Sequence, residues 1–148
     1  MKVQLAKNLF ILTNKLRRLL EKEHNKNGMH IGQARVLKYL YGNQDQSIYQ
    51  KDIEQTFQIR SGTVTGLLDS LSKNGLIMRK ESTVDKRRNV ISLTKRGIEV
   101  AELSIDTYNS FEDKIISSLS ENELKVFNNV LIKLHDWTEQ EELDEKAI

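Results

Sequence analysis

Two residue types are missing from this chain of 148 residues, which has no cysteine and no proline. Without cysteine there is neither a disulfide framework nor a thiol that oxidation could switch, and a reducing, cytoplasmic compartment fits. Without proline, long helices can run uninterrupted. No stretch approaches the ~20 consecutive apolar residues of a membrane span, and Gln4, Lys7 and Asn8 interrupt the apolar run where a signal peptide would be continuous. We expect one cytoplasmic domain with no membrane contact.

Catalytic signatures are also missing. The chain contains no H-E-x-x-H, no glycine-rich phosphate loop and no G-x-S-x-G elbow. Its three histidines, His24, His30 and His135, are too few and too scattered to form a four-ligand zinc site by themselves. We therefore expect no enzymatic activity, no cofactor and no metal.

Charge is distributed unevenly along the chain, although the net charge is only +2. Residues 58–97 carry nine Lys and Arg against three Asp and Glu, a local net charge of +6. Residues 112–148 carry four cations against ten acids, a local net charge of −6. The middle of the chain is thus suited to an anionic partner such as nucleic acid, whereas the acidic end is typical of a solvated helix terminus.

Both ends of the chain are predicted to be amphipathic helices with apolar stripes. Ser120 and Glu123 form an S-x-x-E capping box that marks the start of the last helix. The small central part of the chain cannot cover both stripes, so association of two chains through these helices is expected. The residues expected in this interface are Leu5, Leu9, Leu12, Leu16, Leu124, Phe127, Leu131 and Leu134.

The central segment has the pattern of a helix-turn-helix. Ser47 is positioned to cap a short helix that carries Ile48, Ile53 and Phe57 inward, and a second helix starts near Ser61. With the β-hairpin that follows them in the chain, these elements predict a fold class that is mainly α with a small β-hairpin. The expected architecture is a winged helix-turn-helix flanked by N- and C-terminal dimerisation helices. We expect dimerisation helices in residues 1–28 and 98–148 and the winged helix-turn-helix in residues 31–97.

The hairpin follows the second helix and has a cationic tip. In 76-LIMRKES-82 and 89-NVISLT-94 apolar and polar residues alternate, as they do in two paired strands. Between them, 85-DKRR-88 concentrates cations that a chain reversal does not require. Together with small hydroxyl side chains at the start of the second helix, this tip favours double-stranded DNA as the partner. The expected DNA-binding residues are Arg60, Ser61, Thr63, Thr65, Ser70, Lys73, Lys86, Arg87 and Arg88.

Three segments resemble the MarR family of bacterial transcriptional regulators. They are 61-SGTVTGLLDSLSKNGLIMR-79, the 85-DKRR-88 tip and 93-LTKRG-97, and the similarity in element order covers nearly the whole chain. The resemblance implies a homodimer that binds pseudo-palindromic operators, usually as a repressor, and that a small ligand can release. It also implies that Arg87 enters the DNA minor groove, that Asp85 orients it and that Arg88 contacts the backbone nearby.

Two features qualify this resemblance. Gly66 stands where many members carry a long polar residue facing the groove, which shifts specificity toward the wing and DNA shape. The absence of a thiol excludes cysteine oxidation and leaves ligand binding or no ligand at all. The resemblance implies a small aromatic or anionic ligand as the effector, and His30, Arg35, Tyr39 and Tyr49 are the candidate cleft residues. The alternative function is a winged-helix protein-interaction module that places its basic wing on an acidic partner.

Overall fold

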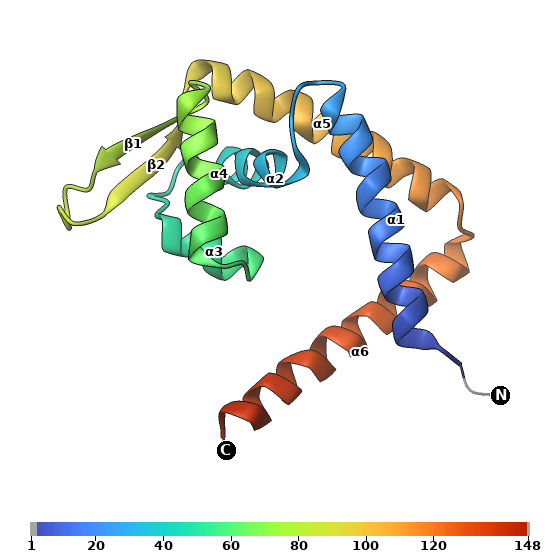
Figure 1. Cartoon of the computed structure of the whole chain (residues 1–148). Helices are drawn as coiled ribbons and strands as arrows, with labels where there is room; N and C mark the ends of the chain where they lie inside the picture. The colour runs from blue at the N-terminus through green and yellow to red at the C-terminus, as the bar shows by residue number, and fades with distance from the viewer. Residues whose placement is uncertain (1–2, 148) are drawn as a thin grey trace. The chain divides into compact units, whose positions relative to one another are not determined.

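The computed structural model describes residues 3–147, so residues 1–2 and 148, at the outer ends of the two predicted dimerisation ranges, lie outside the described residues. Six helices and one hairpin follow one another along the chain (Figure 1). They are α1 (Leu5–Asn25), α2 (Ile31–Gly42), α3 (Gln50–Phe57), α4 (Ser61–Lys73), β1 (Ile77–Glu81), β2 (Asn89–Leu93), α5 (Lys95–Ser117) and α6 (Glu121–Lys146). This order confirms the predicted fold class. The chain divides into two compact units, Met1–Asn109 and Ser110–Ile148.

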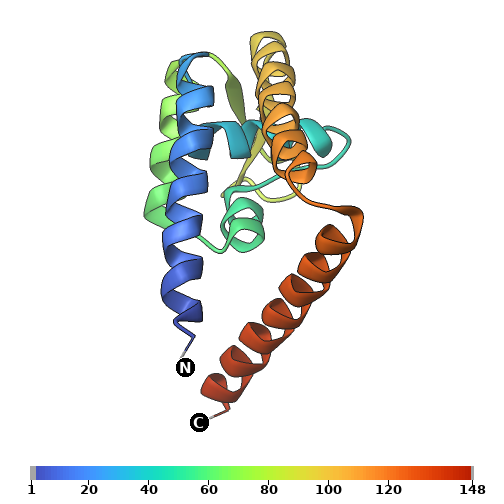
Figure 2. The ribbon, with the colours of Figure 1, turned by 90° about the vertical axis from the view of Figure 1, so that its right-hand side faces the viewer.

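The hydrophobic core of the first unit is built around α2, which contacts α1, α4 and β2 (Figures 1 and 2). Val36 and Leu37 of α2 are fully buried, as are Leu68 and Leu71 of α4. Burying such side chains stabilises the fold by about 1.5–3 kcal/mol each. Because the apolar side of α4 packs against this core, the opposite side of α4 is exposed to solvent.

The start of α3 differs from the sequence-based expectation. The helix begins at Gln50 and its N-cap is Tyr49, so Ser47 does not cap it. The Tyr49 N–H donates to Asp52 Oδ2 at 2.8 Å. Ile48 is buried as predicted, but it lies before the helix, where it forms an isolated antiparallel bridge with Ile91 of β2. The prediction failed because a long-range backbone pairing removed Ile48 from the local helix.

The two strands form an antiparallel hairpin whose register runs from Ile77 opposite Leu93 to Glu81 opposite Asn89. Ile77 and Ile91 point into the core and are buried. At the other end of β1, Ser82 donates its N–H to the Arg88 carbonyl at 2.9 Å and closes the tip. Residues 82–88 therefore form a loop that projects beyond the paired strands (Figure 1).

The start of α5 explains the L-T-x-x-G pattern. Thr94 Oγ1 accepts the Gly97 N–H at 3.0 Å and donates to the Gly75 carbonyl at 2.6 Å, so one hydroxyl caps α5 and ties it to the end of α4. A Cβ on Gly97 would collide with the Leu76 carbonyl. Glycine at this position is thus required by close packing of α5 against the chain leaving α4.

Two glycine substitutions should have opposite effects on stability. Gly97→Ala should lower the free energy of unfolding by about 1–3 kcal/mol, since the Leu76 backbone must move. Gly66→Ala should raise it by about 0.5–1 kcal/mol, because a Cβ there meets nothing within 4 Å and alanine favours a helix interior. Urea denaturation of both variants measures the difference, and changes of the same sign would contradict this packing.

The second unit consists of the C-terminal end of α5 and the whole of α6. Ser120 and Glu123 form the predicted capping box, in which Ser120 Oγ accepts the Glu123 N–H at 3.1 Å and Glu123 Oε1 accepts the Ser120 N–H at 3.0 Å. No described residue of α6 is buried, and Phe127 and Leu131 are exposed. Across residues 3–147, no helix has both the length and the apolar character that crossing a membrane requires.

Candidate nucleic-acid interface

The outward side of α4 carries the predicted recognition residues, and these fall into two groups. Arg60, Ser61, Thr63 and Lys73 are exposed, and within the described part of the chain their side chains make no hydrogen bond or ion pair. By contrast, the hydroxyls of Thr65 and Ser70 are engaged inside the protein. These two residues therefore have less capacity for a nucleic acid than the sequence suggests.

Thr65 and Ser70 fix α4 to its neighbours. Thr65 Oγ1 donates to the Ser61 carbonyl and accepts from Gln50 Nε2, both at 2.9 Å. Ser70 Oγ accepts from the Gln33 amide at 2.7 Å. Since Gln50 is the first residue of α3 and Gln33 lies in α2, these bonds set the position of α4 between the two helices.

The wing tip holds Arg87 next to Asp85. The Asp85 carboxylate accepts the Arg87 backbone N–H at 3.0 Å and the guanidinium at 3.2 Å through Nε. These bonds, first from the Arg87 backbone and then from its side chain, lower the pKa of Asp85 below its usual range. The carboxylate thus stays ionised, while the Arg87 side chain remains 91% exposed. The tip presents a partly oriented cation to solvent.

The base of the wing rests on Tyr49. The Tyr49 hydroxyl lies 3.0 Å from Ser82 Oγ, and the Arg88 guanidinium lies 3.6 Å from the centre of the Tyr49 ring. This is the geometry of a cation–π contact. The structure therefore brings Tyr49 to the wing and not to the cleft in which the sequence placed it.

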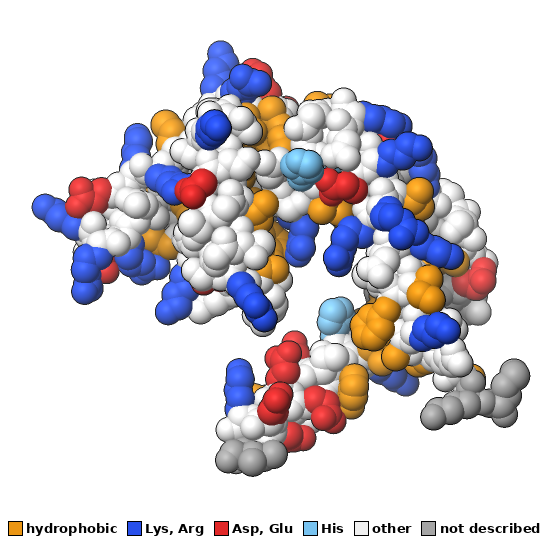
Figure 3. Space-filling model, in the orientation of Figure 1, with side chains coloured by type: hydrophobic (Ala, Val, Ile, Leu, Met, Phe, Trp, Pro, Cys, Tyr) orange, Lys and Arg blue, Asp and Glu red, His pale blue; other side chains and the backbone are white. Residues whose placement is uncertain are grey.

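A groove of about 390 Å³ runs between α3, α4 and the wing. Its lining includes four cations, Lys51, Arg79, Arg87 and Arg88, and one acid, Glu54. Lys and Arg side chains also gather around the hairpin in Figure 3. A groove with this charge balance is suited to a phosphate backbone.

Sequence reasoning missed several residues of this surface. Gln50 and Lys51 belong to it because the first turn of α3 lies beside α4, which a helix-turn-helix pattern could have indicated. Arg79 Nη2 lies 2.7 Å from Asp69 Oδ1 and ties β1 to α4. No sequence signal identifies this ion pair, since it depends on how the hairpin folds back.

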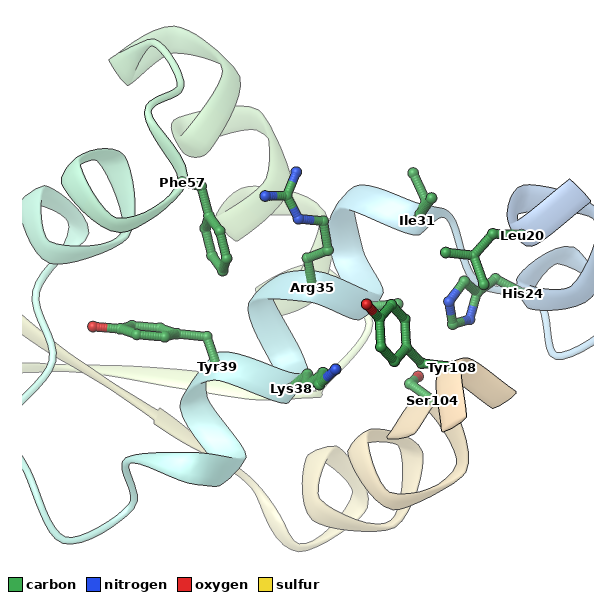
Figure 4. A pocket seen from close by; sticks show the side chains of 10 residues that line it. Leu20, His24, Ile31, Arg35, Lys38, Tyr39, Phe57, Ser104 and Tyr108 are labelled. Carbon is green, nitrogen blue, oxygen red and sulfur yellow. The ribbon is translucent and has the colours of Figure 1, made fainter. Parts of the chain in front are cut away.

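The same unit contains a cavity of about 370 Å³ between α1, α2, α3 and α5 (Figure 4). Of the four predicted cleft residues, Arg35 and Tyr39 line it, whereas His30 and Tyr49 do not. His30 lies instead beside Glu21, with 3.0 Å between Nδ1 and Oε1. The remaining lining residues are Leu20, His24, Ile31, Ala34, Lys38, Phe57, Ser104 and Tyr108.

Two cations of α2 each lie against an aromatic ring of this cavity. The Arg35 guanidinium lies 4.5 Å from the centre of the Phe57 ring, and Lys38 Nζ lies 3.5 Å from that of Tyr108. Tyr39 and Phe57 meet edge to face, with ring centres 5.6 Å apart. The walls thus combine apolar surface with positive charge, which suits an aromatic or anionic compound. Lys38 and Tyr108 were not predicted, since their meeting requires α2 and α5 to pack together.

His24 gives this region a pH dependence. The side chain is 2% exposed, and its Nδ1 has no hydrogen-bond partner among the described residues. Burial lowers the pKa of His24 below 6.5, against the opposing effect of Glu21. As the pH falls below 6.5, the unfolded chain takes up this proton before the folded one, so stability is lost.

Urea denaturation between pH 7.5 and 5.5 should show this loss. The wild-type free energy of unfolding should fall more steeply with decreasing pH than that of His24→Leu, by at most about 1.4 kcal/mol per pH unit. His135→Leu, a change at an exposed position, should retain the wild-type slope. Equal slopes for wild type and His24→Leu would show that His24 has the same pKa in both states.

Comparisons with known proteins agree with this architecture. Residues 27–88 match the MarR family. The chain is 26% identical over 129 residues to the HTH-type transcriptional repressor YetL of Bacillus subtilis, covering 87% of this chain and 77% of YetL. It is 30% identical over 112 residues to the HTH-type transcriptional regulator MhqR of the same organism, covering 76% of each.

Among solved structures, a crystal structure of the S. aureus MepR–DNA complex superimposes with a TM-score of 0.86 at 26% identity, covering 91% of this chain and 98% of the other. The named relatives are transcription regulators, a class of proteins that are in general not enzymes. The match at residues 27–88, the identity to MhqR and the shared fold show that this chain belongs to the MarR family.

Proposed function

We propose that this protein regulates transcription by binding a pseudo-palindromic DNA operator as a homodimer. The observation that carries the proposal is the wing tip, where Asp85 holds an Arg87 side chain that is 91% exposed. A guanidinium is planar, permanently charged and weakly hydrated, so it suits a narrow and strongly negative minor groove. The similarity to MepR, which was solved in complex with DNA, supports the same use of the wing here.

The two elements beside the wing complete the interface. The exposed residues at the start of α4, Arg60, Ser61 and Thr63, face the major groove, and Lys73 and Lys86 contact phosphates. Gly62 and Gly66 leave the outward side of α4 without long side chains, since a Cβ at either position would meet nothing within 4 Å. Specificity therefore depends more on the wing and on DNA shape than on base contacts from α4.

The homodimer is proposed to form through the terminal helices, in residues 1–28 and 98–148. Leu5 and Leu12 of α1 are exposed, as are Phe127 and Leu131 of α6. Apolar stripes of this length are seldom left in solvent, and a second copy of the chain would cover them. The neighbouring positions Leu9, Leu16, Leu124 and Leu134 are half-buried and extend the same stripes.

Repression, release by a ligand and a cytoplasmic location are the finer parts of the proposal. The name of YetL as a repressor supports repression. The cavity lined by Arg35, Tyr39 and Lys38 has a volume and a lining that suit a small aromatic or anionic effector. A cytoplasmic location follows from the operator, since chromosomal DNA is the proposed partner.

Measuring affinity against salt concentration tests the proposal. Duplex DNA from upstream of the protein's own coding region should bind, and its affinity should fall as salt is added. The slope of log K against log salt concentration should be near −0.9 for each phosphate neutralised, and each dimer should neutralise several phosphates. A random duplex of equal length is the control, and it should bind more weakly. Failure to bind any duplex at low salt, together with binding to an acidic protein, would favour the protein-interaction alternative.

A further inference from the structure

We infer that Tyr49 is a positioning residue of the wing, which it locks to the start of α3 through the buried hydroxyl of Ser82. The inference rests on the proposed function, because the wing is taken as the DNA-reading element. Tyr49 touches both sides of the tip loop: its hydroxyl meets Ser82 just after β1, and its ring faces Arg88 just before β2. No other described aromatic side chain makes a contact of this kind with the wing.

Tyr49 is itself held rigidly. Its backbone N–H donates to Asp52 Oδ2 at 2.8 Å, and its carbonyl accepts the Asp52 N–H at 3.1 Å. The preceding residue, Ile48, accepts the Ile91 N–H at 2.8 Å. Tyr49, which lies under the wing, is thus fixed to α3 through Asp52 and to β2 through Ile48.

The choice of residue at this position agrees with a long-range role. A helix N-cap is normally Ser, Thr, Asp or Asn, whose short side chain accepts a backbone N–H of the first turn. Tyr49 makes no such bond. Its side chain is directed instead to the wing, across 33 residues of sequence to Ser82.

Ser82 connects Tyr49 to the backbone of the wing tip. It is 3% exposed, although it lies next to a solvent-exposed loop. Its Oγ accepts the N–H groups of Val84 and Asp85 at 3.2 and 3.3 Å. With both lone pairs engaged, the hydroxyl proton is directed to the Tyr49 oxygen. The Asp85 backbone is therefore tied to α3, and the Asp85 carboxylate in turn orients Arg87.

The restraint matters because a two-stranded hairpin is flexible on its own. If the wing were free, binding would have to order it before Arg87 could enter the groove, and affinity would fall accordingly. Fixing the base of the wing to α3 sets the distance between Arg87 and the start of α4. Tyr49 would thus act on DNA affinity through Arg87 and not by its own contact.

A thermodynamic cycle with Arg87→Ala tests the inference. Tyr49→Phe and Ser82→Ala should each lower operator affinity by about 5-fold or more, because Tyr49→Phe removes one hydrogen bond and Ser82→Ala removes three from each wing of the dimer. In the Arg87→Ala background the same changes should cost at most about 2-fold. Tyr41→Phe is the matched control: its hydroxyl lies 3.4 Å from Glu102, away from the wing, and affinity should be unchanged.

Hydrogen exchange of the free protein supplies a readout that does not depend on DNA. The Val84 and Asp85 amides should exchange faster in Ser82→Ala and Tyr49→Phe than in wild type and Tyr41→Phe. Equal losses of affinity in both Arg87 backgrounds would overturn the inference and make Tyr49 a separate DNA contact. Unchanged exchange at Val84 and Asp85 would also overturn it. Absence of DNA binding by wild type would instead defeat the proposed function, while the exchange result would still decide whether Tyr49 restrains the wing.

Discussion

Replacing Arg87 by Ala should raise the operator dissociation constant by roughly 30-fold or more, equivalent to about 2 kcal/mol. A specific contact in a groove contributes about 1–3 kcal/mol, and a homodimer loses it from two wings. The thermal midpoint should hardly change, because the side chain is 91% exposed and an exposed ion pair contributes little to folding. Fluorescence anisotropy with a labelled operator and a thermal melt of the free protein measure the two effects.

Two further substitutions separate the roles of charge and shape at the tip. Lys86→Ala, next to Arg87, would remove a proposed phosphate contact and should mainly reduce the salt dependence of binding. Arg87→Lys keeps the charge but loses the planar guanidinium, so its affinity should fall between those of wild type and Arg87→Ala. If Arg87→Ala unfolded the protein or left the affinity intact, the proposed role of the residue would be wrong.

Replacing Leu131 by Glu should separate or unfold the dimer and abolish operator binding. Leu131 is 37% exposed in the single chain, and a second copy is its expected cover. Placing a carboxylate in that interface should cost at least about 2 kcal/mol per chain, because a buried unpaired charge is strongly unfavourable. Sedimentation equilibrium and circular dichroism at micromolar concentration would show a smaller or less helical species.

Asn129→Glu is the matched control for this experiment. It adds the same charge to α6, about half a turn of the helical wheel away from Leu131, at an exposed position. Its oligomeric state and DNA affinity should remain close to those of wild type. Leu12→Glu in α1 should reproduce the effect of Leu131→Glu. A Leu131→Glu chain that stays monomeric, folded and tightly bound to DNA would contradict dimerisation through the terminal helices.

Elements with local signals were predictable from the sequence. Gly75 takes a left-handed φ of 72° two residues after α4 ends, a conformation that glycine adopts without steric cost. The capping box at Ser120 was likewise predicted from two residues that are three positions apart. Period-2 alternation placed the hairpin, and the ion pair between Asp85 and Arg87 forms at the predicted tip. In each case the interacting groups are close in sequence.

Contacts between distant segments were not predictable. Tyr49 was a candidate residue of the ligand cleft, whereas the pairing of Ile48 with Ile91 places it against the wing. Ser70 is predicted to bind DNA, and nothing in the sequence indicated that its hydroxyl also accepts a hydrogen bond from the Gln33 amide of α2. Periodicity shows which side of a helix is apolar, but it does not show where two helices cross or what lies opposite a polar side chain. The DNA-binding, ligand and dimerisation assignments of individual residues remain predictions.

A hydroxyl-radical footprint of the purified protein on DNA upstream of its own coding region tests the central claim most directly. Two wings held in one homodimer should protect two half-sites centred about 10 base pairs apart on one face of the duplex, with minor-groove protection at each outer edge. Two chains should be bound per duplex. One protected half-site with one chain bound, or no protection at low salt, would contradict the claim.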